Sequence, residues 1–422
     1  IQVGRYEWMT RTPDGYFSGT DEALQHINFV RGLTSIAADQ LFKRFYKPDL
    51  LESLGQMGEH NVRNLLSENP PAEIEIAGFK EPEELSASVF IKYLSNRSSI
   101  KELKVYHNGK RLDLSEQDMK VEDNVVELKL NLVAGPNEFK AIATNKASID
   151  SRAVSWTTYA SNAVPASTCY ILTIGINEYE NPQLNLNYAN ADASSFGAKL
   201  VELGQGLYHE MIEVKILDSD GSRLNIIDRL NEVAEAITAN DVFVFYYAGH
   251  GVYVNEEYYL VPTETKRLYD EKVLEKTALS ATELQQALSG IRALKQLIVL
   301  DACQSGGSVE LLAQRGGLEE KAIAQLSRSS GIHVMASAGS EQYATEFDQL
   351  GHGIFTYILL EALSGKADGA PKDGKVTINE LRSYLDARVP EESAQLKGVS
   401  QYPYTFSRGN DFPLVLVRAV SY

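Results

Sequence analysis

Two continuous apolar runs, each followed by small residues and a reactive side chain, constrain this chain more than any other feature. The first covers 242–247 and leads into Ala248-Gly249-His250-Gly251. The second covers 297–300 and leads into Asp301-Ala302-Cys303. Because these runs do not alternate with polar residues, they predict strands buried on both faces of a parallel sheet. Open α/β sheets place their active sites beyond the carboxyl ends of the strands, so the sequence predicts one site that joins an imidazole and a thiol.

Cys303 follows His250 by 53 residues, and the two side chains together suit acyl transfer. A free thiol has a pKa of about 8.5, so an adjacent imidazole is needed to take its proton and later to protonate the leaving amine. The reaction also needs hydrogen-bond donors where the oxyanion forms. We expect the backbone N–H groups of Gly251 and Cys303 to be these donors, since glycine lets the main chain approach closely.

Two simpler interpretations of these residue types stand beside this one. A lone histidine is usually structural, and that interpretation is kept for His26, His60, His107, His209, His333 and His352. A metal site is the second alternative. The chain has only Cys169 and Cys303, with no Cys-x-x-Cys or His-x-x-x-His pair, so the sequence predicts no zinc site and no other metal site.

At these motifs the chain resembles the caspase-like cysteine proteases, and among them the bacterial relatives of metacaspases (orthocaspases). His250-Gly251 is similar to the family's His-Gly turn, and Cys303-Gln304-Ser305-Gly306 to its Cys-x-Ser-Gly loop. The caspase signature Gln-Ala-Cys-x-Gly is nearly met, except that Asp301 replaces the Gln and an extra Ser precedes the Gly. The resemblance covers about residues 165–420. It implies an α/β, caspase-hemoglobinase-like fold: a six-stranded, mostly parallel sheet with flanking helices and a Cys-His dyad.

The resemblance also implies an acidic pocket for the P1 side chain. In metacaspase-like enzymes an Asp two residues before the Cys and an Asp on the first helix line this pocket; Asp301 and Asp192 match these positions. Two carboxylates at one rim attract a cation and repel an acidic side chain, so we expect cleavage after Arg or Lys. Ser337 is expected to contact the substrate backbone. The alternatives are that Asp192 only interacts with a helix dipole and that Asp301 is a hydrogen-bonded loop carboxylate.

The peptidase domain is expected to span 165–422. By the same resemblance it divides into a large-subunit-like part, a linker and a small-subunit-like part: 165–306, 307–330 and 331–422. In caspase-like zymogens this linker is often cut, and the candidate self-cleavage sites are Arg315, Lys321 and Arg328. An ordinary surface loop is the alternative.

The composition of the chain limits the classes of molecule that it is expected to bind. The net charge of −17 argues against nucleic acid and anionic membranes, and it favours cationic peptide segments. No apolar stretch reaches 18 residues, so no membrane span is expected. Two cysteines suggest a reducing compartment, which we take to be the cytoplasm. Metacaspases often bind calcium after the His strand, but residues 255–263 lack the expected aspartates, so neither calcium dependence nor another cofactor is expected.

The N-terminal part is expected to form two further regions. Residues 71–160 contain the alternating stretches 74–76, 103–105 and 126–132 and the hairpin turn Asn108-Gly109, which predict an all-β, immunoglobulin-like sandwich. Residues 1–70 predict a hairpin and helix, and resemble the connector that follows a WD-repeat propeller in large bacterial caspase-like proteins. That resemblance implies an upstream propeller or regulatory partner.

Pattern and length also predict the elements of the peptidase domain. We expect strands near 170–176, 213–217, 242–247, 297–301, 332–337 and 412–416. We expect helices near 187–203, 223–238, 281–291, 353–364 and 377–387. Together they predict a six-stranded sheet between helices.

Three functions follow as hypotheses. The first is a cysteine endopeptidase that cleaves after Arg or Lys. The second is a latent signalling scaffold of the same fold with weak catalysis. The third is a caspase-type protease that cleaves after Asp. Turnover of peptides that end in Arg or Lys, and its loss in Cys303→Ala, distinguishes the first hypothesis from the other two.

Overall fold

The protein is described here by a computed structural model of its 422 residues. The residues it describes are 8–31, 34–47, 50, 62–83, 85–95, 99–115, 117–161, 165–255, 257–303, 320–328, 330–337, 346–347, 351–398 and 400–417. The chain divides into two compact units, Ile1–Pro165 and Ala166–Tyr422.

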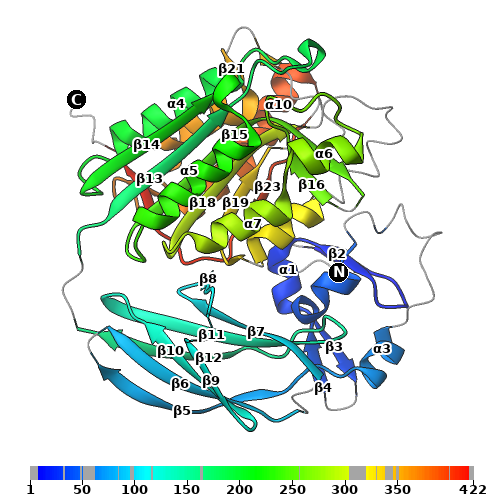
Figure 1. Ribbon diagram of the computed structural model, residues 1–422. Coiled ribbons are helices and arrows are strands. Elements are labelled where there is room, and N and C mark those ends of the chain that lie inside the picture. The colour runs from blue at the N-terminus through cyan, green and yellow to red at the C-terminus, as the bar shows by residue number, and fades with distance from the viewer. Residues whose placement is uncertain are drawn as a thin grey trace. The chain divides into compact units, whose positions relative to one another are not determined.

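The first unit contains two four-stranded antiparallel sheets (Figure 1). One has the order β5-β6-β10-β9 and the other β12-β11-β7-β8. Their strands are β5 (Ile74–Glu83), β6 (Ser86–Tyr93), β7 (Ile100–His107), β8 (Lys110–Arg111), β9 (Met119–Glu122), β10 (Val125–Asn131), β11 (Gly135–Asn145) and β12 (Val154–Ala160). This confirms the predicted β domain.

Alternation in these strands builds one shared core. In β10, for example, Val126, Leu128 and Leu130 are buried, whereas Lys129 between them is exposed. Side chains of both sheets, among them Ile91 and Phe139, belong to the same apolar cluster. The residues before β5 form β1 (Met9–Arg11), β2 (Phe17–Gly19), α1 (Asp21–His26), β3 (Asn28–Arg31), β4 (Thr34–Ala37), η1 (Ala38–Leu41), α2 (Phe42–Phe45) and α3 (Val62–Glu68).

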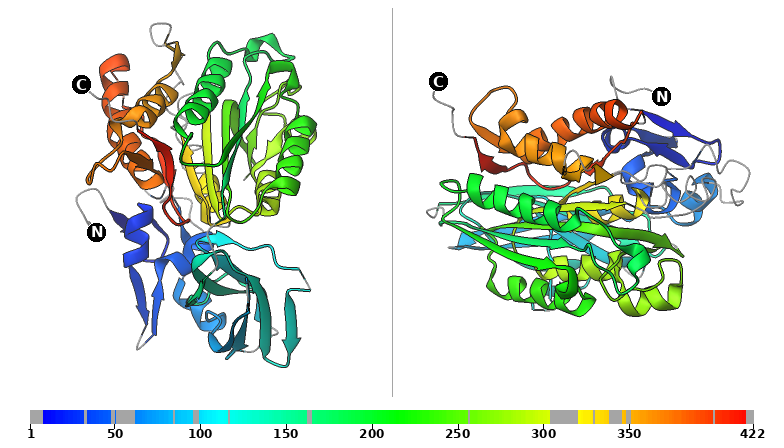
Figure 2. Two further views of the ribbon diagram at one scale, coloured as in Figure 1. Left: turned by 90° about the vertical axis from the view of Figure 1, so that its left-hand side faces the viewer. Right: turned by 90° about the horizontal axis from the view of Figure 1, so that it is seen from above.

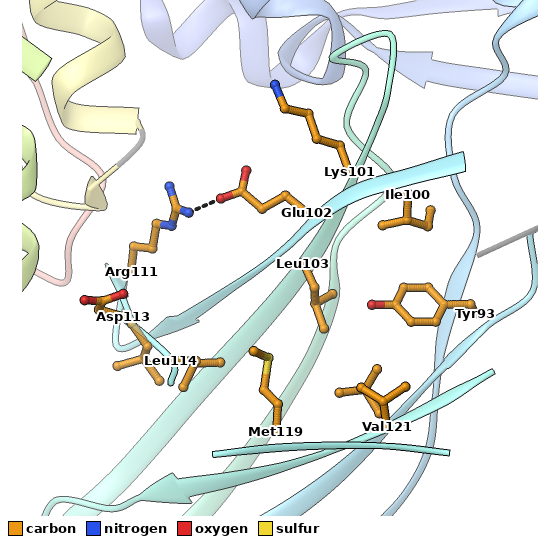
Figure 3. Close-up of a pocket in the computed structure, with 12 residues that line it drawn as sticks. Tyr93, Ile100, Lys101, Glu102, Leu103, Arg111, Asp113, Leu114, Met119 and Val121 are labelled. Carbon is orange, nitrogen blue, oxygen red and sulfur yellow. Dashed lines mark hydrogen bonds and ion pairs between the residues drawn. The ribbon is translucent and has the colours of Figure 1, made fainter. Parts of the chain in front are cut away.

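A cavity of about 480 Å³ opens in this unit where β8 and β9 end their sheets (Figure 3). Leu103, Leu114 and Met119 line it, and they are partly buried residues at the fringe of the core. Arg111 and Glu102, at the cavity wall, form an ion pair. The cavity is therefore a place where the core of the β domain reaches the surface beside charges of both signs.

The second unit is a mixed α/β sheet with helices (Figure 1). Six of its strands follow the order β14-β13-β15-β18-β19-β23, all parallel except β23. These strands are β13 (Thr168–Gly175), β14 (Glu210–Leu217), β15 (Val242–Val254), β18 (Lys295–Cys303), β19 (His333–Ala336) and β23 (Tyr404–Phe406). In the sheet, β14 lies on one side of β13, and the next strand in the chain, β15, lies on its other side. The crevice at such a switch point is where α/β sheets bind ligands.

Helices cover both faces of this sheet (Figure 2, left). One face packs against α4 (Ala189–Leu203), α9 (Ile354–Glu361) and α10 (Ile378–Lys397) in a single buried cluster. The remaining elements are η3 (Pro182–Leu184), η4 (Asp218–Asp220), α5 (Arg223–Ala236), β16 (Glu257–Leu260), α6 (Glu271–Thr277), β17 (Leu279–Ser280), α7 (Ala281–Gly290), β20 (Glu346–Phe347), β21 (His352–Gly353), η5 (Ala362–Lys366), β22 (Lys375–Thr377) and β24 (Pro413–Leu416). The α/β class and the helix layers were predicted.

The strand expected near 412–416 is present, but its expected place as the sixth strand of the main sheet was wrong. The sheet ends with β23, which pairs antiparallel with β19, whereas the stretch expected near 412–416 forms β24 and pairs with β22. Leu414 and Val415 are buried in the cluster around α4 and α9. An apolar run predicts burial, but it does not tell which strand will be its partner.

Three further boundaries differ from the predictions. β15 continues beyond 247 to Val254 and turns into a hairpin with β16. α10 extends to Lys397 although Pro390 lies inside it; its apolar side chains Leu381, Leu385 and Val389 stay buried in the cluster. Residues 320–328, in the expected linker, are helical.

Candidate active site

The His250 imidazole is held at the end of the parallel part of β15. Its Nε2 lies 2.7 Å from the carbonyl oxygen of Leu184, which ends η3 in the loop after β13. Its backbone N–H donates to the Tyr179 hydroxyl at 3.0 Å, and the Tyr179 ring centroid lies 5.0 Å from the imidazole. His250 is 3% exposed. The loop after β13 therefore fixes both the backbone and the ring of this residue.

The Leu184 contact fixes the tautomer of a neutral His250. A carbonyl oxygen can only accept a hydrogen bond, so Nε2 carries the hydrogen and donates it. In a neutral imidazole the other nitrogen, Nδ1, is then an acceptor. The nitrogen that can take up a proton is thus Nδ1.

Tyrosine hydroxyls surround the glycines on both sides of His250. A Cβ on Gly249 would lie 2.7 Å from the Tyr247 hydroxyl and 2.9 Å from that of Tyr179. A Cβ on Gly251 would collide with the Tyr258 hydroxyl. The Tyr247 hydroxyl also lies 2.9 Å from the carbonyl oxygen of His250. Burial raises the pKa of Tyr179 and of Tyr247, so both hydroxyls keep their hydrogens.

Cys303 is the last residue of β18, and its Cα pairs with that of His250 in the parallel register of β15 and β18. The two predicted dyad positions are therefore direct neighbours on adjacent strands. The Cys303 side chain lies outside the described residues.

Asp192, in the first turn of α4, is buried and joined to β21. Its Oδ1 lies 2.7 Å from Nδ1 of His352, and its Oδ2 accepts the backbone N–H of Gly353 at 3.2 Å. The Asp192 side chain is 6% exposed and that of His352 is 20% exposed. Sequence reasoning assigned His352 a purely structural role and did not connect it with this carboxylate.

Asp301 lies on β18, two residues before Cys303. Its Oδ2 accepts a hydrogen bond from the Thr356 hydroxyl at 2.6 Å, and the Tyr246 hydroxyl lies 2.6 Å from the same Thr356 oxygen. Burial, and next the charge of Asp192, raise the pKa of Asp301 to about 6, while hydrogen bonds from Thr356 and Ser337 oppose that rise. A raised pKa is what is expected of a buried carboxyl group beside a second carboxylate.

The two carboxylates meet at Gly353. A Cβ built on this glycine would lie 3.3 Å from Oδ2 of Asp192 and 3.4 Å from Oδ2 of Asp301. Among the described residues, leaving out its chain neighbours, no other heavy atom lies within 4 Å of that point. The structure thus brings the carboxylates of the two predicted P1-binding residues within 3.4 Å of one point beside Gly353.

The other predicted site residues are placed as follows. Ser337 directly follows β19; it is 1% exposed, its N–H donates to the Leu300 carbonyl at 2.9 Å, and its hydroxyl bonds Asp301. Gly251 begins the antiparallel pairing of β15 with β16. Lys321 and Arg328 lie in the helical stretch 320–328. Arg315 lies outside the described residues.

Several residues of the site were missed in the sequence. No sequence pattern marks the Leu184 carbonyl, because every residue has a backbone carbonyl. The adjacent tyrosines 246 and 247 gave a signal that was interpreted only as an apolar strand. His352-Gly353 repeats the His-Gly pattern of His250-Gly251, and that repetition could have marked it.

The described residues contain no group of three or more His, Cys, Asp or Glu side chains arranged to hold a metal ion. In the same residues, no helix is long and apolar enough to cross a membrane.

The chain is distantly similar to solved structures of other proteins. Protein GSU0716 from Geobacter sulfurreducens is 17% identical, with 60% of this chain and 98% of that chain covered and a TM-score of 0.42. The polysaccharide deacetylase BC0361 from Bacillus cereus is 11% identical, with 68% and 85% covered and a TM-score of 0.19. Scores this low carry no argument about fold or function. No curated protein matches the chain.

Comparison with protein families finds a match that lies within the second unit. Residues 168–414, more than half of the chain, match the family described as caspase domain. The matched range includes His250, Cys303 and both carboxylates at Gly353. The chain belongs to the caspase-domain family of cysteine peptidases.

Proposed function

We propose that the second unit is a cysteine endopeptidase with a His250–Cys303 dyad. The observation that carries the proposal is the register of β15 and β18, in which these residues are direct neighbours. Nδ1 of His250 takes the thiol proton, and the thiolate attacks the scissile carbonyl carbon. The C–N bond then breaks, and the imidazolium protonates the leaving amine. Water hydrolyses the thioester, with His250 as the base, and regenerates the thiol.

The oxyanion needs donors beside the attacked carbonyl. We assign this role to the backbone N–H groups of Gly251 and Cys303, which lie beside the dyad on the same two strands. The loss of one such donor commonly costs about 10²–10³ in rate. The proposed reaction uses no metal ion and no cofactor.

The proposed specificity is for Arg or Lys at P1. A cationic nitrogen near the point beside Gly353 would contact carboxylates of both Asp192 and Asp301. The same pair would repel an acidic side chain, and this argues against cleavage after Asp. A guanidinium can bind two carboxylate oxygens at once, so we expect Arg to be preferred over Lys.

Further parts of the proposal concern partners. The substrates are proteins or peptides with a basic P1 residue, whereas nucleic acid and membranes are not expected partners, as the net charge of −17 suggests. We place the chain in the bacterial metacaspase-like branch and in the cytoplasm, and treat 71–160 as an immunoglobulin-like recognition module. An upstream propeller or regulatory partner would supply the activating signal.

Peptide turnover tests the proposal. We expect the full chain to hydrolyse fluorogenic peptides with P1 Arg or Lys, and Cys303→Ala to abolish that activity. Asp192→Asn and Asp301→Asn should each lower kcat/KM for the Arg peptide by about tenfold or more, since one pKa unit of interaction corresponds to a tenfold change. Turnover after Asp would overturn the specificity. No turnover under any activation condition would favour the latent scaffold instead.

A further inference from the structure

Asp192 is shared between the proposed P1 pocket and an internal imidazole. His352 Nδ1 lies 2.7 Å from Asp192 Oδ1, and the Gly353 N–H lies 3.2 Å from Oδ2. The same Oδ2 atom lies 3.3 Å from the point that a Cβ on Gly353 would occupy. The carboxylate therefore faces the histidine with one oxygen and the proposed P1 site with the other.

A neutral and a protonated His352 do different things to this carboxylate. The neutral imidazole donates one hydrogen bond and leaves the negative charge of Asp192 available. The imidazolium places a full positive charge beside the same group, so it neutralises part of the field that would attract a P1 cation. Histidine is the side chain that ordinarily changes charge between pH 5 and 8.

We propose that His352 is a specificity-determining residue of this pocket: when neutral it holds the Asp192 carboxylate in place, and when protonated it competes with the basic P1 side chain for that carboxylate. This inference rests on the proposed function. It predicts that protonation of His352 weakens cleavage after a basic P1 residue, by a mechanism separate from the titration of the dyad.

Several charged or titratable residues lie near His352 or its neighbours. Among the described residues, Asp192 of α4 and Asp301 of β18 are the carboxylates at the pocket. The backbone of Glu346 in β20 pairs with that of Gly353, and the Glu346 side chain lies outside the described residues. Tyr246 of β15, joined to Asp301 through Thr356, has a pKa raised well above its usual value and stays neutral. Asp301 itself titrates at about pH 6, so its own contribution must be separated experimentally.

The first arm of the test is a pH profile in three proteins. kcat/KM for a P1 Arg peptide is measured from pH 5 to 8.5 in the wild type, in His352→Asn and in His209→Asn. Asn keeps a neutral N–H donor but cannot become a cation, and His209 is exposed on the same unit. Titration of the dyad and of Asp301 is common to all three proteins.

We expect the ratio of kcat/KM between pH 8 and pH 5.5 to be about tenfold smaller in His352→Asn than in the wild type, as one pKa unit of charge interaction implies. His209→Asn should keep the wild-type ratio. His352→Leu, which removes the donor as well, should lower kcat/KM at every pH. Identical acid limbs in the wild type and His352→Asn would overturn the proposal.

The second arm does not need turnover. The His352 imidazole of the inactive Cys303→Ala chain is titrated by NMR, its signal being the one absent in His352→Asn. Asp192→Asn should lower its titration midpoint, and saturating N-acetyl-arginine amide should lower it too. If the peptides are not cleaved, the proposed function fails, yet this arm still decides the inference. Midpoints unchanged by both perturbations would refute it.

Discussion

At the scale of single residues, Asp301 combines a proposed functional charge with an unfavourable environment. Burial and the charge of Asp192 raise the pKa of its carboxyl to about 6, above the value of about 3.9 in an unfolded chain. The folded state thus binds this proton more tightly than the unfolded state. The resulting stabilisation is fully present below about pH 4 and is lost as the pH rises through about 6.

Asp301→Asn should therefore stabilise the protein at neutral pH while impairing its proposed activity. We expect the free energy of unfolding in urea to rise by about 1–2 kcal/mol at pH 7.5 and to change little at pH 4, where the carboxyl is already neutral. The exposed Asp220 gives a matched control, and Asp220→Asn should leave both values unchanged. A loss of stability at pH 7.5 in Asp301→Asn would contradict the assignment.

The tautomer of His250 is a second property of one residue that can be tested. Donation from Nε2 to the Leu184 carbonyl leaves Nδ1 as the nitrogen that can accept a proton. Because the side-chain amide of glutamine can imitate the Nε2 donor, His250→Gln should keep the free energy of unfolding within about 1 kcal/mol of the wild type but abolish peptide hydrolysis. ¹⁵N shifts of Cys303→Ala should show the Nε2–H form at pH 8. An Nδ1–H form would contradict the geometry.

Whether a residue of the site could be predicted from the sequence depends on whether its side chain or its backbone takes part. His250, Cys303, Asp192 and Asp301 have reactive side chains, so their residue types and motifs marked them in advance. The Leu184 contact uses a backbone carbonyl, which no residue type reveals. His352 meets Asp192 across 160 residues of sequence, and only the fold brings them together.

At the scale of secondary-structure elements, β15 has a second part, paired with β16, that the sequence did not indicate. Its apolar run predicted the parallel part, and the register with β18 begins at Val242. The same strand then continues from Gly251 as one arm of the hairpin with β16. The change of partner at Gly251 could not be inferred, because periodicity reports burial and not the identity of the neighbouring strand. For the same reason, the sequence did not show that β23 pairs with β19 and that β24 pairs with β22.

Gly251→Ala tests this change of partner. The added Cβ would collide with the Tyr258 hydroxyl and lie 3.2 Å from the Cβ of Ala302, so β15, β16 and β18 would have to separate. We expect a loss of about 1–3 kcal/mol in the free energy of unfolding, the usual cost of overpacking. Gly290→Ala is the matched control. Its nearest neighbour would be 3.9 Å away, so that variant should be unchanged or more stable. Equal stability in both variants would argue against the close packing.

At the scale of the whole molecule, the two units have separate cores. The cluster of the β domain draws its residues from 72–160, whereas the cluster under α4 and α9 draws its residues from 169–417. Every described residue of the candidate site lies in the second unit. The β domain was predictable from alternation and turns. The inclusion of the first 70 residues in the same compact unit was not, because contacts such as that of the Gln40 side chain with the Asp150 carbonyl join distant segments.

Self-cleavage is the prediction that concerns the intact chain. A protease binds its substrate extended, and a bond inside a helix must first be unwound. Lys321 and Arg328 lie in the helical stretch 320–328, whose Ile323, Ala324 and Leu326 are buried. Unwinding this helix would expose that apolar surface. Of the three candidates, we therefore expect the cut to fall after Arg315.

Mass spectrometry of the purified chain distinguishes the three sites. Fragments that end at Arg315 should appear in the wild type and be absent in Cys303→Ala. Arg315→Gln should prevent the cut, and Lys321→Gln, the matched control, should not. A cut after Lys321 or Arg328 would mean that the helix opens before cleavage, against the burial of its apolar face. Fragments in both the wild type and Cys303→Ala would point to a contaminating protease, because the inactive chain cannot cut itself.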